Sequence, residues 1–101
     1  MDSAEKLAAA FAAAESTGLA FLSPIGPLVL AAAWEEIAQD SRKFARVFDV
    51  EHALVIRECV HLASDLNLIT LTYKNERSSR VGYELNDKGL GIFNAGPLAP
   101  V

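Results

Sequence analysis

Two short clusters of basic residues are the groups in this sequence best suited to binding a charged partner. Their members are Arg42, Lys43 and Arg46 in the first cluster, and Lys74, Arg77 and Arg80 in the second. Guanidinium and ammonium groups at such spacing form charge-assisted hydrogen bonds with phosphate oxygens and release condensed counterions. We therefore expect both clusters to contact phosphates, although the net charge of −4 excludes a non-specific polyanion binder.

Cys59 and His61, with His52 before them, invite a metal-site interpretation that their spacing opposes. Residues two positions apart on a helix point about 200° away from each other, so Cys59 and His61 cannot share an ion. We expect the thiol in the core and both histidines at the surface. The sequence also has no glycine-rich phosphate loop, no nucleophile elbow and no base beside Ser78 and Ser79. We therefore expect no enzyme activity, no metal and no cofactor.

The composition is that of one folded domain. Of the 101 residues, 51% are hydrophobic and 22% are charged, which is too apolar for a disordered chain. The single cysteine cannot form an intrachain disulfide, which favours a reducing, cytoplasmic location. Residues 16–34 carry no charge, but Pro24 and Pro27 would break the helix that a membrane span requires. We therefore expect no membrane segment.

The first forty residues predict two helices. Asp2 and Glu5 have the spacing of a capping box, and Gly18 is placed to end an alanine-rich helix in the left-handed conformation. The thin apolar stripe of this helix suits either the chain's own core or a homodimer interface. After a link that contains proline and glycine, Pro27 is expected at the first position of a second helix, which continues to about Gln39.

Residues 41–66 have the pattern of a helix-turn-helix. Asp40 or Ser41 caps a short helix, whose expected inward residues are Phe44, Ala45, Val47 and Phe48. Asp49 then caps a longer helix from about Val50 to Leu66. Its expected inward residues repeat at three and four positions, and they are Val55, Ile56, Cys59, Val60, Leu62, Ala63 and Leu66. The side expected to face water has Arg57, Glu58, His61, Ser64 and Asp65.

Residues 67–86 change to a period of two, which predicts a β-hairpin. One face of its first strand would carry Ile69, Leu71 and Tyr73, and one face of the second would carry Val81, Tyr83 and Leu85. The polar turn between the strands carries the second basic cluster. Asn86 or Asp87 then caps a last helix over residues 87–94, which Gly96 and Pro97 end. The expected fold is therefore a single α+β domain over residues 1–101, mainly α with a two-stranded hairpin.

Three stretches of this region carry a family resemblance. They are Phe44-Ala45-Arg46-Val47-Phe48-Asp49-Val50, Asp65-Leu66-Asn67-Leu68-Ile69 and Arg80-Val81-Gly82-Tyr83-Glu84-Leu85-Asn86-Asp87-Lys88-Gly89. Together they resemble the winged helix-turn-helix domain of MarR-like and PadR-like bacterial transcriptional regulators, over about residues 41–93. Asp49 and Asn67 stand where these families often have glycine, and asparagine accepts the left-handed conformation.

The resemblance implies a winged helix-turn-helix with N-terminal helices over residues 1–40, the helix-turn-helix over 41–66, the wing over 67–86 and a C-terminal helix over 87–94. It also implies that helix 50–66 enters the major groove of duplex DNA while the wing lies beside a phosphate backbone or minor groove. It nominates Arg57 and His61 on the helix, with Arg77 and Arg80 on the wing, as DNA contacts.

The expected function is that of a small transcriptional regulator that binds double-stranded DNA, as a homodimer. The full set of expected DNA contacts is Arg42, Lys43, Arg46, His52, Arg57, His61, Lys74, Arg77 and Arg80. The alternative is a winged-helix module that binds a protein and not DNA. It is favoured by residues 1–40, which hold six acids and one base, and by Glu51, Glu58 and Asp65 beside Arg57. A third hypothesis, a ligand-sensing regulator, requires a cavity beside Trp34 or between protomers.

Overall fold

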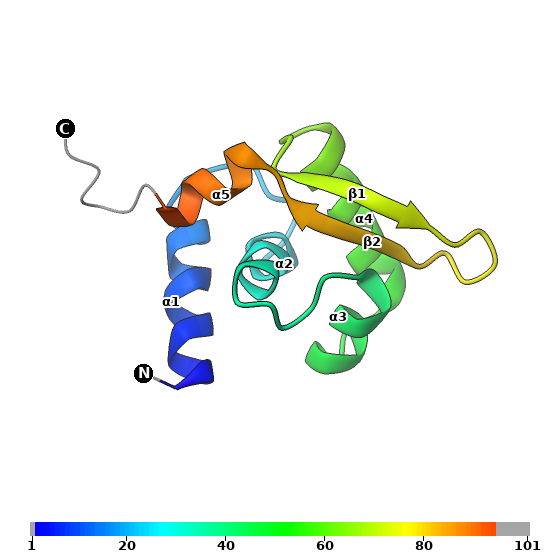
Figure 1. The fold of residues 1–101 in the computed structure, drawn as a ribbon, viewed down its shortest axis with the longest axis horizontal. Coiled ribbons are helices and arrows are strands. Elements are labelled where there is room, and N and C mark those ends of the chain that lie inside the picture. Colours follow the sequence, from blue (N-terminus) through cyan, green and yellow to red (C-terminus); the bar gives the residue numbers. More distant parts are fainter. Residues whose placement is uncertain (1, 95–101) are drawn as a thin grey trace.

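Five helices and one β-hairpin make up residues 2–94, the part of the chain that the structure, a computed structural model, describes (Figure 1). In chain order they are α1 (Ser3–Glu15), α2 (Ile25–Trp34), α3 (Ser41–Phe48), α4 (His52–Ser64), β1 (Ile69–Lys74), β2 (Val81–Leu85) and α5 (Asp87–Asn94). This is the expected mainly helical α+β fold, and the order of its elements is winged-helix-like. Gly96 and Pro97, expected to end the last helix, lie outside the described residues.

The first helix begins with the expected capping box. The carboxylate of Asp2 accepts a hydrogen bond from the backbone N–H of Glu5 at 2.9 Å, and the carboxylate of Glu5 accepts one from the backbone N–H of Asp2 at 3.4 Å. Only the second half of α1 has buried residues, Ala10 and Ala14, and the helix packs on α2 and α5. Part of the thin apolar stripe of α1 therefore covers the chain's own core.

The central helix, α2, is nearly enclosed by the others, and it ends earlier than expected. Pro27 is its third residue rather than its first, and the helix stops well before Gln39. The reason is Glu36, whose φ of 59° is left-handed. The backbone N–H of Ile37 then donates to the carbonyl of Ala32 at 2.8 Å, a hydrogen bond that closes helices with a left-handed residue past the end.

The helices α3 and α4 form the helix-turn-helix, with one cap that differs from the prediction. Asp40 caps α3, since its carboxylate accepts the backbone N–H of Lys43 at 2.8 Å. Asp49 does not cap α4, because it ends α3 in the left-handed conformation (φ 53°) and its N–H donates to the carbonyl of Ala45. The next helix therefore begins only after Glu51, and it spans residues 52–64 instead of 50–66.

Three side chains of the helix-turn-helix lie on the side opposite to the predicted one. Val47 and Val60 were expected in the core and are both 47% exposed, whereas Glu58 was expected in water and is 2% exposed. Glu58 lies three residues after Val55 and four before Leu62, both fully buried, so the helical period places it on the inner face. The prediction was wrong because it followed residue type instead of angular position.

The antiparallel hairpin gains a short third segment from the chain between α2 and α3. The backbone N–H of Tyr83 donates to the carbonyl of Gln39 at 3.0 Å, and Asp40 pairs with Gly82 as an isolated bridge. The start of the helix-turn-helix is thereby hydrogen-bonded to β2. Asn67, before β1, has the left-handed conformation expected for it (φ 54°).

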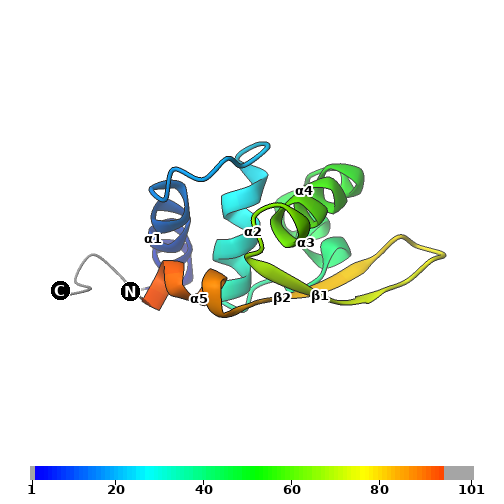
Figure 2. The same ribbon diagram turned by 90° about the horizontal axis from the view of Figure 1, so that it is seen from above.

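The hairpin projects beyond the helices (Figure 2), and every residue of β1 after the first is exposed. Ile69 at its base is 2% exposed, whereas Leu71 is 40% and Tyr73 48% exposed. A register shift between Leu71 and Tyr73 also interrupts the strand, so these residues do not form the continuous apolar face that was predicted. On β2, Val81 and Tyr83 are buried together in the core.

Two glycines of α5 provide a matched test of how closely this helix approaches the start of the hairpin. A Cβ atom at Gly89 would clash with the backbone carbonyl of Leu68, whereas one at Gly91 would meet no atom within 4 Å. Gly89→Ala should lower the free energy of unfolding by about 1–3 kcal/mol through overpacking. Gly91→Ala should raise it by roughly 0.5–1 kcal/mol, because alanine is the better helix former. Urea unfolding measures both, and equal effects would contradict the close approach.

Candidate nucleic-acid interface

One buried hydroxyl group joins the helix-turn-helix to the wing. Ser41, the first residue of α3, is 0% exposed. Its Oγ accepts the backbone N–H of Val81 in β2 at 2.9 Å and lies 2.8 Å from Nε2 of His52, the first residue of α4. Because α3, α4 and β2 all meet at this atom, it fixes the orientation of α4 relative to the hairpin.

The surroundings of His52 disfavour the charged form of its ring. Burial, and then the positive charges of Arg42 and Arg80, lower the pKa of His52 below its ordinary value. Beside the hydrogen bond that it accepts from Val81, Ser41 Oγ shares a second one with Nε2 of His52. His52, expected among the DNA contacts, is thus engaged inside the protein.

Two arginines fasten the hairpin to the start of α3. Arg80 Nε donates to the carboxylate of Asp40 at 3.2 Å, and Arg42 donates to the backbone carbonyl of Ser78 in the hairpin turn, also at 3.2 Å. A partly exposed ion pair of this kind contributes little to stability. Together the two contacts hold the side chains of Arg42 and Arg80 in defined positions between α3 and the hairpin.

The basic residues of both predicted clusters, and Arg57, lie at least partly at the surface. They are Arg42, Lys43, Arg46, Arg57, Lys74, Arg77 and Arg80, on α3, α4 and the hairpin. Within residues 2–94, five of these side chains form no hydrogen bond or ion pair, and they are Lys43, Arg46, Arg57, Lys74 and Arg77. Their charges are therefore available to a partner.

Glu58 does not share the outer face of α4 with Arg57. Its Oε1 accepts a hydrogen bond from Ser23 Oγ in the loop between α1 and α2 at 2.9 Å. Glu51, just before the helix, stays exposed. Of the three acids expected to interrupt the outer face for a protein-interaction surface, only Glu58 is withdrawn into the core, whereas Glu51 and Asp65 stay exposed.

His61 clamps the loop between α1 and α2 onto α4. Its Nε2 donates to the carbonyl of Ala20 and its Nδ1 to the carboxylate of Asp65, each at 2.7 Å. These acceptors, the Ala20 carbonyl first, favour the charged ring and raise the pKa of His61. His61, also expected among the DNA contacts, is thus bonded within the protein.

The outer face of α4 consists of one arginine among apolar and small side chains. Its exposed residues are Ala53, Leu54, Arg57, Val60 and Ser64. Leu54 is 41% and Val60 47% exposed. At about 100° per residue, Leu54 and Val60 lie roughly 60° to either side of Arg57. Residue type alone did not predict that Leu54 and Val60 are exposed beside Arg57. Their helical angle measured from Arg57 would have predicted it.

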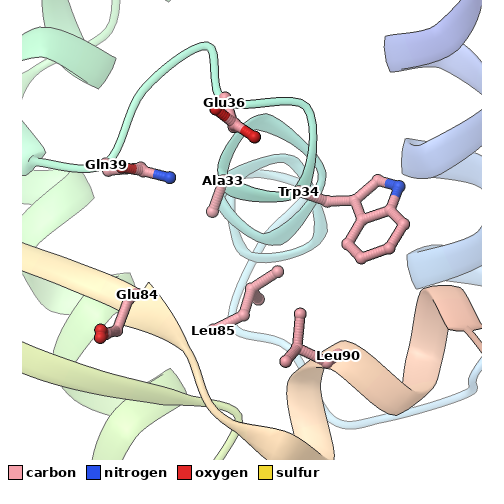
Figure 3. A pocket seen from close by; sticks show the side chains of 7 residues that line it. All are labelled: Ala33, Trp34, Glu36, Gln39, Glu84, Leu85 and Leu90. Atoms are coloured by element: carbon pink, nitrogen blue, oxygen red, sulfur yellow. The ribbon is translucent and has the colours of Figure 1, made fainter.

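A hollow of about 300 Å³ lies beside Trp34, where a ligand-sensing regulator would need a cavity (Figure 3). Its lining is Ala33, Trp34, Glu36, Gln39, Glu84, Leu85 and Leu90. The indole ring stacks on Phe93 with centroids 5.0 Å apart. Figure 3 shows the carboxylate of Glu84 turned away from the indole, so the polar groups do not converge on one point as in a ligand site.

Cys59 is a core residue, as expected. Burial, and then the charge of Glu58, raise the pKa of its thiol to about 12, so the reactive thiolate does not form near neutral pH. Among residues 2–94, no group of three or more His, Cys, Asp or Glu side chains is placed to hold a metal ion. None of the helices described is long and apolar enough to cross a membrane.

A helix-turn-helix joined to a β-hairpin, with a terminal helix on each side, defines a winged-helix-like protein. Comparisons of the chain with protein-family models, with curated proteins and with solved structures find no match. The class therefore follows from the arrangement of the elements themselves.

The His61 clamp predicts a pH-dependent stability. A group whose pKa is raised by folding contributes stability that is fully present below its unfolded pKa, about 6.5, and is lost as the pH rises through the folded value. The free energy of unfolding of the wild type, relative to that of His61→Gln, should therefore decrease as the pH rises above about 6.5. Urea unfolding at a series of pH values measures it, and a constant difference would contradict the clamp.

Removing the hydroxyl group of Ser41 should destabilise the folded protein. Ser41→Ala leaves the backbone N–H of Val81 buried without an acceptor, and it should lower the free energy of unfolding by about 1–3 kcal/mol. Ser64→Ala, at an exposed position of α4, is the matched control and should change it by less than about 0.5 kcal/mol. Thermal unfolding compares the two variants. A Ser41→Ala protein as stable as the control would contradict the role of the Ser41 hydroxyl group in joining α3, α4 and β2.

Proposed function

We propose that this protein is a winged-helix transcriptional regulator, which inserts α4 into the major groove of duplex DNA and lays the hairpin along the phosphate backbone. The observation that carries the proposal is the charge of α4. Glu58 is buried, and Arg57 is the single formal charge among the exposed side chains of the helix. The resemblance of residues 41–93 to MarR-like and PadR-like regulators supports the same function.

The surrounding charges favour a phosphate backbone as the partner. The proposed contacts are Arg57 on the bases and, on phosphates, Arg42, Lys43, Arg46, Lys74, Arg77 and Arg80. Several of the acids that make the whole chain negative are remote from this surface. Asp2, Glu5 and Glu15 lie on or next to α1, at the end of the molecule opposite to the hairpin tip (Figure 1).

The proposal includes a homodimer and a cytoplasmic location. Helix-turn-helix proteins commonly bind two half-sites about 34–36 Å apart, which requires two copies of the reading helix. The outer side of α1 is exposed and includes Ala8, Ala9 and Ala12, small residues that permit close helix packing. A two-fold contact through α1 would leave both hairpins pointing outward (Figure 1).

Salt-dependent binding tests the proposed function. In fluorescence anisotropy with a mixed-sequence duplex, the affinity should fall steeply between about 50 and 200 mM salt, because bound counterions are released. Arg77→Glu, in the hairpin turn, should weaken binding by about tenfold at low salt and reduce the salt slope by about one. Lys6→Glu makes the same charge change on α1, away from the hairpin, and it should leave binding unchanged where its copy number on the duplex equals that of the wild type. Light scattering of the same complex gives the number of protein copies on the duplex.

A second candidate function, a winged-helix module that binds a protein, is favoured by the exposure of Leu54 and Val60 on α4. Exposed apolar side chains on one helix are a common feature of protein interfaces. A folded protein that does not bind the duplex even at low salt would contradict the DNA-binding proposal and select this function instead.

A further inference from the structure

We infer that the outer face of α4 recognises the methyl groups of thymines on either side of a guanine in the major groove. The inference rests on the proposed function, and it adds the base specificity that phosphate contacts do not provide.

The geometry of α4 suits a short run of bases. Leu54 and Val60 are six residues apart, which is about 9 Å along the helix axis and corresponds to between two and three base-pair steps of roughly 3.4 Å. Arg57 lies midway between them along the axis and in angle. Ala53 and Ser64 share this face and are small, so the backbone of α4 would be able to approach the base edges closely.

The chemistry of these three side chains matches two bases. An arginine forms two parallel hydrogen bonds with O6 and N7 of guanine, which is the commonest specific contact in the major groove. Thymine is the base that presents a methyl group there, and apolar side chains contact it. Leu54 and Val60 have no group that could bond the amino group of cytosine, so a cytosine placed against them would lose its hydrogen bond to water.

The same apolar pair fits DNA better than a protein partner because of the charge between its two members. Arg57 stands between Leu54 and Val60 with no ion pair within residues 2–94. An apolar protein surface pressed onto α4 would bury the charge of Arg57, whereas the major groove offers it the acceptors of guanine.

The first experiment selects bound sequences from a random duplex library, prepared once with thymidine and once with deoxyuridine in its place. Deoxyuridine lacks only the C5 methyl group, so base pairing is kept. With thymidine, the selected sites should have thymines on both sides of a guanine, and with deoxyuridine this preference should disappear. In a single selected duplex, each methyl group removed should weaken binding about fourfold.

The second experiment assigns the methyl contacts to α4. In the double variant Leu54→Ala and Val60→Ala, removing the thymine methyl groups should no longer weaken binding, because their partners are gone. Leu22→Ala is the matched control, since Leu22 is 47% exposed but lies in the loop between α1 and α2, and it should keep the full penalty. Both variants alter exposed side chains only, and circular dichroism confirms that they are folded.

The outcomes separate the inference from the function on which it rests. Salt-dependent binding that is indifferent to the methyl groups, or a penalty that persists in the double variant, would overturn the inference and leave the proposed function standing. No duplex binding at low salt would overturn both. A methyl penalty in the wild type that vanishes only in the double variant would establish the inference.

Discussion

The hydroxyl group of Ser41 is the constraint on which the relation between the helix-turn-helix and the wing depends. It is fully buried, it belongs to the first turn of α3, and it is bonded to the backbone of β2 and to the ring of His52 in α4. Asp40, one residue earlier, caps α3 and pairs with Arg80. A buried donor without its acceptor costs more than an average hydrogen bond contributes, so these few bonds hold the two parts in one arrangement.

The two histidines of α4 show how its polar side chains are withdrawn from the surface by hydrogen bonds within the protein. Burial and two nearby arginines lower the pKa of His52, whereas the Ala20 carbonyl and the Asp65 carboxylate raise the pKa of His61. Each is bonded to a segment distant in the sequence. With Glu58 also bonded to the loop before α2, the polar side chains of α4 hold the helix in place. Within residues 52–64, Arg57 is then the one exposed residue with a formal charge.

Features set by neighbouring residues could be predicted from the sequence, and those set by distant ones could not. The capping box of Asp2, the cap at Asp40, the hairpin and the exposed basic clusters all follow from local spacing. The hydrogen-bond partner of Glu58 is Ser23, a residue 35 positions away, and that of His61 is Ala20, 41 positions away. Helical angle would have found the exposed Val60, but residue type alone gave the opposite assignment.

The left-handed residues at the junctions have a consequence for how relatives of this chain would look. Within residues 2–94, the four non-glycine residues with positive φ follow α2, α3 and α4 or lie in the hairpin turn, and they are Glu36, Asp49, Asn67 and Ser79. Such positions accept glycine or asparagine readily and reject valine or isoleucine, whose branched Cβ clashes with the backbone. During divergence, apolar residues of the core would replace one another, while these four positions would stay small or polar. Distant relatives of this sequence would therefore keep glycine, asparagine or another polar residue at these four positions even where the residues of the core differ.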